Sequence, residues 1–162
     1  MASVTSEGAP VGRILSPKEV LDRIPQQEPF RFIDEISEID GEHCLASYRW
    51  REDADFYRGH FPGDPVTPGV LLVEALAQAS VVAMGAYIFH RDFPEDEAAK
   101  IVPFFTDANV DFSGVVRPGE RVFTEARKVF FRRRKLRIEG EMKLEDGTVV
   151  LSGTLSGLGI AR

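Results

Sequence analysis

Three residues suited to acid–base or anion-stabilising chemistry lie on either side of a short loop rich in proline and glycine. His60 lies inside the loop, and because histidine titrates near neutral pH it can act as a general base. Glu74 is the single charged residue of the apolar stretch that follows, residues 69–89. Burial would raise the pKa of its carboxyl group and suit it to act as an acid. Gly69 begins that stretch, and backbone N–H groups at a helix start can stabilise a developing oxyanion.

Each of these residues also has an ordinary structural interpretation. A histidine in a loop can be solvated, a lone buried glutamate can accept hydrogen bonds from neighbouring backbone groups, and glycine is common at the start of a helix. Their arrangement around one constrained loop favours a catalytic interpretation and leaves the structural one open.

The segments that must position these residues are a rigid loop and a helix. Residues 58–69 contain three glycines and three prolines, which leaves little freedom for regular structure. Residues 69–89 are apolar on every side, which predicts a helix surrounded by protein. A membrane span is the alternative by length, but a carboxylate at mid-membrane depth costs roughly 2.5 kcal/mol or more. We therefore expect a buried helix, with Glu74 and Gln78 one turn apart on one face.

The remaining segments predict a sheet that can wrap this helix. Ser16, Pro17 and Glu19 have the pattern of a capping box and predict a short helix that ends near Pro25. Strands are predicted at residues 31–39, 43–50, 101–113, 120–132, 134–144 and 148–160. The expected fold is α+β, with a curved antiparallel sheet around one long central helix and a sheet edge able to pair with a second subunit. We expect a flexible tail at residues 1–12 and a single domain at residues 13–162.

The composition excludes several classes of protein. The 162 residues are 43% hydrophobic and 28% charged, as in one ordinary globular domain. A balance of 20 Lys and Arg against 26 Asp and Glu gives a net charge of −6, which disfavours general nucleic-acid binding. Cys44 is the single cysteine, so the chain cannot form an internal disulfide. We expect Cys44 to be a half-buried strand residue. With no visible secretory signal and no metal-ligand spacing, a cytoplasmic protein without metal or cofactor is expected.

The loop and the first turns of the helix carry a motif known from one enzyme family. Residues 59–78 read GHFPGDPVTPGVLLVEALAQ. This segment resembles the Gly-His-Phe-Pro-Gly, Pro-Gly-Val-Leu and Glu-Ala-x-Ala-Gln pattern of bacterial β-hydroxyacyl-acyl-carrier-protein dehydratases of the Z type. These are hotdog-fold enzymes of type II fatty-acid synthesis. Residues 25–36 and 105–120 are similar to two further segments of that family, so the resemblance extends over most of the chain and implies a hotdog fold.

The resemblance also implies a mechanism and a role for four residues. His60 would remove the proton α to the thioester carbonyl of a (3R)-hydroxyacyl chain. Glu74 would protonate or orient the departing hydroxyl, so that water leaves and a trans-2-enoyl chain remains. The N–H of Gly69, together with that of Val70, would stabilise the enolate-like oxygen. This mechanism agrees with the chemistry expected from the residues themselves.

Supporting residues and partners follow from the same resemblance. Gln78 would form a hydrogen bond within the site, and Phe61 would support it from beside His60. The substrate would be carried on the phosphopantetheine arm of an acyl carrier protein. The active unit would be a homodimer in which the histidine and the glutamate of one site come from opposite subunits, and a trimer of dimers is a compatible assembly. The reaction needs no metal or redox cofactor, and no nucleic acid or membrane is an expected partner.

Two departures from the family pattern keep other functions open. Gln26 and Gln27 stand where the family has a His-Arg pair. Residues 64–68 are similar to a sister subfamily that also isomerises the double bond, whereas Glu74 stands where that subfamily has aspartate and so favours the plain dehydratase. The alternatives are a hotdog dehydratase/isomerase or thioesterase of a specialised lipid or polyketide pathway, and a non-catalytic acyl-binding subunit.

A basic cluster stands out in this acidic chain. Arg132, Arg133, Arg134 and Lys135 are consecutive. A solvated strand face or turn is the ordinary interpretation. The functional alternative is a docking surface for the acidic carrier protein, through charge complementarity.

Overall fold

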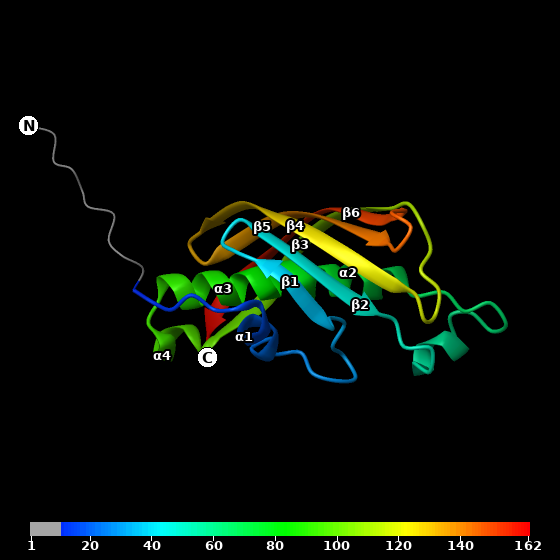
Figure 1. The fold of residues 1–162 in the computed structure, drawn as a ribbon, viewed down its shortest axis with the longest axis horizontal. Helices are drawn as coiled ribbons and strands as arrows, with labels where there is room; N and C mark the ends of the chain where they lie inside the picture. The colour runs from blue at the N-terminus through cyan, green and yellow to red at the C-terminus, as the bar shows by residue number, and fades with distance from the viewer. Residues whose placement is uncertain (1–10) are drawn as a thin grey trace, which may run out of the picture.

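A computed structural model describes residues 11–162 of the chain. Six antiparallel strands form one sheet in the order β1-β2-β4-β5-β6-β3, and this curved sheet wraps one long helix (Figure 1). The strands are β1 (Glu35–Ile39), β2 (His43–Arg49), β3 (Ile101–Phe112), β4 (Arg121–Arg132), β5 (Lys135–Leu144) and β6 (Val149–Ala161). The helical segments are α1 (Pro17–Asp22), η1 (Asp55–Arg58), α2 (Gly69–Ala77), η2 (Gln78–Val82), α3 (Ala83–Asp92) and α4 (Glu95–Ala98). The predicted α+β hotdog fold is confirmed.

The long helix is the core of the domain. The segments α2, η2 and α3 form one continuous helix, Gly69–Asp92, that is long and apolar enough to cross a membrane. However, 67% of an apolar 18-residue window of this helix is buried inside the domain, as expected for a core helix. Two glycines of β6 let the sheet lie close to this helix: a Cβ at Gly157 would overlap Val81, and a Cβ at Gly159 would overlap the ring of Phe89.

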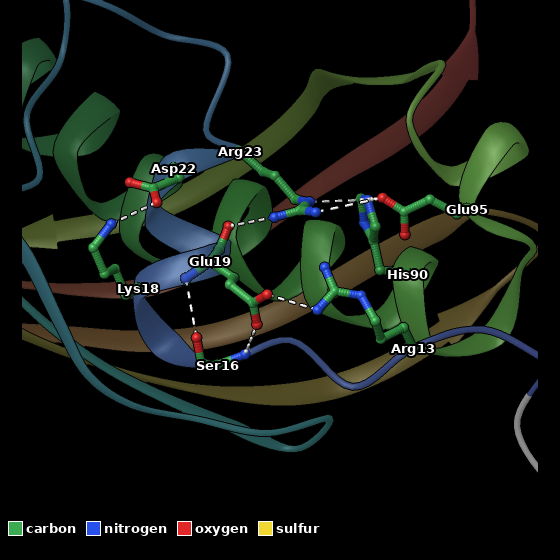
Figure 2. Close-up of polar contacts among 8 residues, drawn as sticks. All are labelled: Arg13, Ser16, Lys18, Glu19, Asp22, Arg23, His90 and Glu95. Atoms are coloured by element: carbon green, nitrogen blue, oxygen red, sulfur yellow. Dashed lines mark hydrogen bonds and ion pairs between the residues drawn. The ribbon is translucent and has the colours of Figure 1, made fainter.

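The N-terminal part of the domain closes over the end of this helix. The backbone N–H of Gly12 donates to Arg91 O and that of Arg13 donates to His90 O, at 3.1 and 2.6 Å. The predicted capping box is confirmed, because Ser16 and Glu19 exchange both hydrogen bonds at the start of α1 (Figure 2). Most of the predicted tail, residues 1–10, lies outside the described residues, whereas Gly12 is attached to the domain.

The strand boundaries agree with the predicted ones except at the first strand. Residues 31–39 were expected to be extended throughout, but β1 begins at Glu35. The backbone of Phe30 and Phe32 hydrogen-bonds instead to the side chain of Gln78 on the central helix. A tertiary contact therefore takes the N–H of Phe32, which a sheet ladder would have used.

One face of β2 packs against the central helix, as its alternating sequence predicts. Cys44, Ala46 and Tyr48 of this strand, with Trp50 after it, are all buried. The expectation that Cys44 is half-buried is wrong, because the wrapped sheet leaves it no exposed surface. Burial raises the pKa of its thiol to about 12, so it is protonated and unreactive at neutral pH.

Candidate active site

His60 is held in one tautomer by the loop that follows η1. Its Nδ1 lies 2.9 Å from the carbonyl oxygen of Val66. Because a carbonyl can only accept, Nδ1 must carry the hydrogen, and the neutral ring then presents an unprotonated Nε2. The ring also stacks on Phe61, with the two centroids 4.1 Å apart. The loop therefore leaves Nε2 as the ring nitrogen that can accept a proton.

The loop itself is fixed by contacts to neighbouring segments. Tyr57 of η1 and Thr67 share a buried hydrogen bond of 2.7 Å between their hydroxyl oxygens. The backbone N–H of Thr67 donates to Val116 O at 2.8 Å. Arg117 forms an ion pair with Asp64, its Nη1 lying 2.9 Å from the Oδ1 atom. The proline and glycine content predicts a rigid loop, but these anchors have no signal in the sequence, because they join residues about 10 to 50 positions apart.

Glu74 lies in the second turn of α2, half-buried, with its carboxyl group held by Gln78. The Nε2 of Gln78 donates to Glu74 Oε1 at 2.9 Å. Burial raises the pKa of Glu74, and the hydrogen bond from Gln78 opposes part of that rise. The carboxyl group is therefore protonated at a higher pH than an ordinary glutamate, as a general acid requires.

Gln78 is fully buried and joins three parts of the site. Its Oε1 accepts from Phe32 N at 2.7 Å, and its Nε2 donates to Phe30 O at 3.0 Å as well as to Glu74. An amide is well suited to this position because it offers both an acceptor and two donors. Gln78 thus orients Glu74 against a fixed backbone segment.

The start of the central helix offers two unused N–H donors. The N–H groups of Leu71 and Leu72 both donate to Pro68 O. Among the described residues, the N–H groups of Gly69 and Val70 have no acceptor, as expected at the first turn of a helix. These are the two groups that the sequence assigns to oxyanion binding, and the helix dipole adds positive potential there.

The helix widens to a π turn at Gln78–Val82, directly after the turn that carries Glu74. Within it, Ser80 Oγ donates to Leu76 O at 2.5 Å and so competes for a carbonyl of the helix ladder. Turns of this kind frequently occur at functional sites. No residue pattern in the sequence indicates it.

The structure brings some predicted site residues together and keeps others apart. Glu74 and Gln78 are in direct contact, whereas no hydrogen bond joins His60 to Glu74 within residues 11–162 of one chain. His43, at 3.6 Å from a carboxylate oxygen of Glu125, and the buried His90 lie outside the site.

The basic cluster spans the end of β4, the two-residue turn that follows and the start of β5. This turn lies at the α3 end of the domain, where Arg134 pairs with Glu97 of α4 at 2.8 Å (Figure 1). Lys135 pairs with Asp107 at 3.1 Å. Arg132 and Arg133 are exposed and make no ion pair with another described residue. Half of the cluster is therefore neutralised within the domain.

Comparison with known proteins decides the family. The FabA-like domain family matches residues 24–154. This chain belongs to that family. Among curated relatives of this FabA-like chain, the 3-hydroxyacyl-[acyl-carrier-protein] dehydratase FabZ of Caulobacter vibrioides is 32% identical over 129 residues, which cover 79% of this chain and 78% of the relative. The FabZ of Geotalea uraniireducens is 37% identical, over 71% of this chain and 77% of the relative.

Solved structures with the same fold include dehydratases and thioesterases. The dehydratase heterocomplex ApeI:P from Xenorhabdus doucetiae superimposes on the FabA-like chain with a TM-score of 0.73 at 17% identity, covering 91% of this chain and 93% of the other. A thioesterase from Haemophilus influenzae gives a TM-score of 0.65 at 16% identity, covering 92% and 93%. At these identities the likeness concerns the fold, which supports several reactions.

Proposed function

We propose that this chain dehydrates (3R)-hydroxyacyl groups carried on acyl carrier protein to the trans-2-enoyl form, in fatty-acid synthesis. The observation that carries the proposal is the placement of His60 and Glu74 on the FabA-like loop and helix. The contact of Nδ1 with Val66 O leaves Nε2 as the ring nitrogen of His60 that can accept a proton, and burial raises the pKa of the half-buried Glu74 carboxyl group. The FabZ dehydratases that match most of the chain support the same reaction.

Each step uses a group whose position the structure describes. Nε2 of His60 removes the proton from the carbon next to the thioester carbonyl. The N–H groups of Gly69 and Val70 donate to the enolate oxygen that forms. The carboxylic acid of Glu74 gives its proton to the hydroxyl at the next carbon, the C–O bond breaks, and water leaves. Transfer of the proton from the imidazolium to the carboxylate restores both groups.

The product identifies the reaction and separates it from the alternatives. The purified chain would be incubated with a 3-hydroxyacyl-acyl-carrier-protein, and the acyl products would be separated and identified. We expect the trans-2-enoyl thioester. Release of free carrier thiol would indicate a thioesterase, a cis-3-enoyl product would indicate an isomerase, and unchanged substrate would indicate a non-catalytic subunit.

We further propose that the active unit is a homodimer formed along β3. This strand is an edge of the sheet and pairs only with β6 among the described strands. Phe104 and Phe105 lie on it with 40% and 50% of their surface exposed. A long edge strand with exposed aromatic residues is a ready template for a second copy. A dimer of this kind would let His60 of one subunit face Glu74 of the other. We also propose that the enzyme is located in the cytoplasm.

The dimer is tested by changing the edge strand alone. We expect the wild-type chain to sediment as a dimer or a multiple of it at micromolar concentration. Phe105→Lys should shift it towards monomer and lower activity in parallel, because a charge cannot be buried in that interface. Phe123→Lys is the matched control. Phe123 is also exposed, by 42%, but it lies on β4, which is not an edge strand because it pairs with β2 and β5. An active monomer would contradict the shared site. A wild-type chain that stays monomeric and inactive would indicate a different partner chain.

We also propose that the exposed tip of the β4–β5 turn docks the carrier protein. Arg133 and Arg134 have φ angles of 50° and 62°, a left-handed conformation that glycine or asparagine adopts more readily. Arginines are thus kept at positions that cost backbone energy. Because Arg134 is paired with Glu97, Arg132 and Arg133 are the residues that present positive charge to an acidic partner.

Charge reversal tests this docking surface. The double change Arg132→Glu and Arg133→Glu should raise KM for the carrier-linked substrate several-fold and leave turnover of a pantetheine thioester unchanged. The effect should shrink towards 1 M salt, where screening acts over about 3 Å. Arg58→Glu, on η1 beside the His60 loop, is the comparison. If Arg58→Glu alone raises KM, the docking surface lies at the loop end of the domain. Equal losses on both substrates would mean that the two arginines support the fold.

A further inference from the structure

Two hydroxyl groups occupy the buried part of the loop that carries His60. Within residues 51–70, only Tyr57 and Thr67 are buried, with 6% and 5% of their surface exposed. Their hydroxyl oxygens lie 2.7 Å apart and share one hydrogen bond. Burial raises the pKa of Tyr57, so the phenol is neutral at neutral pH. The pair therefore acts through its hydrogen bond rather than through charge.

Val66 orients the imidazole ring, and both of its backbone groups contact His60. Its N–H donates to His60 O at 2.9 Å, and its carbonyl oxygen lies 2.9 Å from His60 Nδ1. Since that carbonyl keeps the hydrogen on Nδ1, a change in its direction would let the ring turn or carry the hydrogen on Nε2. The state of the base therefore depends on how Val66 is held.

The next residue, Thr67, has two anchors of its own, which fix the carbonyl group before it. Its N–H donates to the O atom of Val116, a fully buried residue, at 2.8 Å. Its hydroxyl group bonds to Tyr57, which lies on η1. The other side of the loop is bound by the same η1 turn, since Phe56 O accepts from the N–H of His60 at 3.0 Å. The hydrogen bond between Tyr57 and Thr67 thus closes a ring of contacts around His60.

The ion pair on the same loop is a weaker anchor. The side chains of Arg117 and Asp64 are 56% and 73% exposed, and ion pairs at the surface contribute little because water and salt compete for them. Two buried hydroxyl groups are shielded from that competition, and loss of one leaves the other unsatisfied. Loss of the bond between Tyr57 and Thr67 should therefore disturb the loop more than loss of the ion pair.

We propose that Tyr57 and Thr67 are positioning residues for the base of the reaction. Their shared hydrogen bond holds the Val66 carbonyl in place, which keeps the hydrogen of His60 on Nδ1 and leaves Nε2 free to accept the substrate proton. The proposal rests on the proposed dehydratase function and adds two residues that act through His60. Neither hydroxyl group transfers a proton to or from the substrate.

Removal of one hydroxyl group tests this role. Tyr57→Phe keeps the ring and deletes only the group that bonds to Thr67. We expect kcat for a 3-hydroxyacyl-acyl-carrier-protein to fall about 5–50-fold, less than the roughly 10²-fold that a 1 Å misplacement can cost. KM should change less than about twofold, because no group that binds substrate is altered. Tyr87→Phe is the matched control. Tyr87 is a buried tyrosine of α3, away from the loop, and this variant should keep kcat within about twofold of wild type.

Changes at Thr67 separate positioning from a general effect on stability. Thr67→Ser keeps the hydroxyl group and should stay within about threefold of wild type, whereas Thr67→Val keeps the shape and should lose kcat as Tyr57→Phe does. The double change Tyr57→Phe and Thr67→Val leaves neither hydroxyl group unpaired, so its Tm should exceed that of either single variant while kcat stays low. Recovery of kcat together with Tm would overturn the proposal, since the pair would then only support the fold.

Nitrogen NMR of the histidine rings separates this proposal from the dehydratase function, because it needs no turnover. The chain has three histidines, and the signals of His60 are those missing from His60→Ala. At a pH where the rings are neutral, wild type should carry the hydrogen on Nδ1 of His60, and Tyr57→Phe should show a mixture of the two tautomers. An unchanged tautomer in Tyr57→Phe would overturn the positioning role. If the tautomer changes as expected but wild type dehydrates no substrate, the dehydratase function fails and the positioning of His60 stands.

Discussion

His60→Ala is expected to lower kcat for dehydration by about 10²–10⁴-fold, the range for loss of a positioned general base. The fold should be retained, because the ring is only partly buried and its hydrogen bond to Val66 lies within the loop. Steady-state kinetics on a 3-hydroxyacyl-acyl-carrier-protein, with circular dichroism of the variant, would measure both effects.

A second histidine provides the control for this experiment. His43 lies on β2 between Glu38 and Glu125, outside the site. His43→Ala should therefore retain activity within about twofold. If His60→Ala turned over at a rate close to that of wild type, another group would have to be the base.

Glu74 gives the second large effect, and two substitutions separate its possible roles. Glu74→Ala removes both the acid and the acceptor for Gln78, and we expect a loss of about 10²–10⁴-fold in kcat. Glu74→Gln keeps the shape and can still accept the hydrogen bond from Gln78, but it has no acidic proton to give. A comparable loss in Glu74→Gln is expected if the carboxyl group is the acid. A loss below about tenfold would make it an orienting group instead.

The raised pKa of Glu74 also predicts a pH dependence of stability. The pKa in the folded chain lies above the usual value of 4.5, so folding favours the protonated form. The stabilising contribution of that form is complete below the unfolded pKa and is lost as pH rises through the folded pKa. Glu74→Gln is neutral throughout. The Tm of Glu74→Gln minus the Tm of wild type should therefore increase as pH rises from below 4.5 towards neutral. If this difference did not change with pH, burial would not raise the pKa of Glu74.

Local patterns in the sequence were sufficient for most of the fold. The capping box at Ser16 and Glu19, the alternation from Cys44 to Trp50 and the apolar stretch from Gly69 each act through neighbouring residues, and all three give the predicted elements. The loop motif around His60 identified the family for the same reason, since its residues are contiguous. The first strand was predicted too long because a distant side chain, Gln78, takes the backbone N–H of Phe32.

The sequence by itself determined which residues can do the chemistry, because residue type fixes what a side chain can donate, accept or protonate. It therefore indicated a histidine, a carboxylate and a helix start as candidates for the chemistry, with a central helix and a wrapped sheet to hold them. Only the tertiary structure decided the properties that depend on surroundings. Contact with Val66 selects the nitrogen that His60 presents, and burial beside Gln78 raises the pKa of Glu74. The hydrogen bond between Tyr57 and Thr67 exists because the folded loop brings the two hydroxyl groups together and buries them.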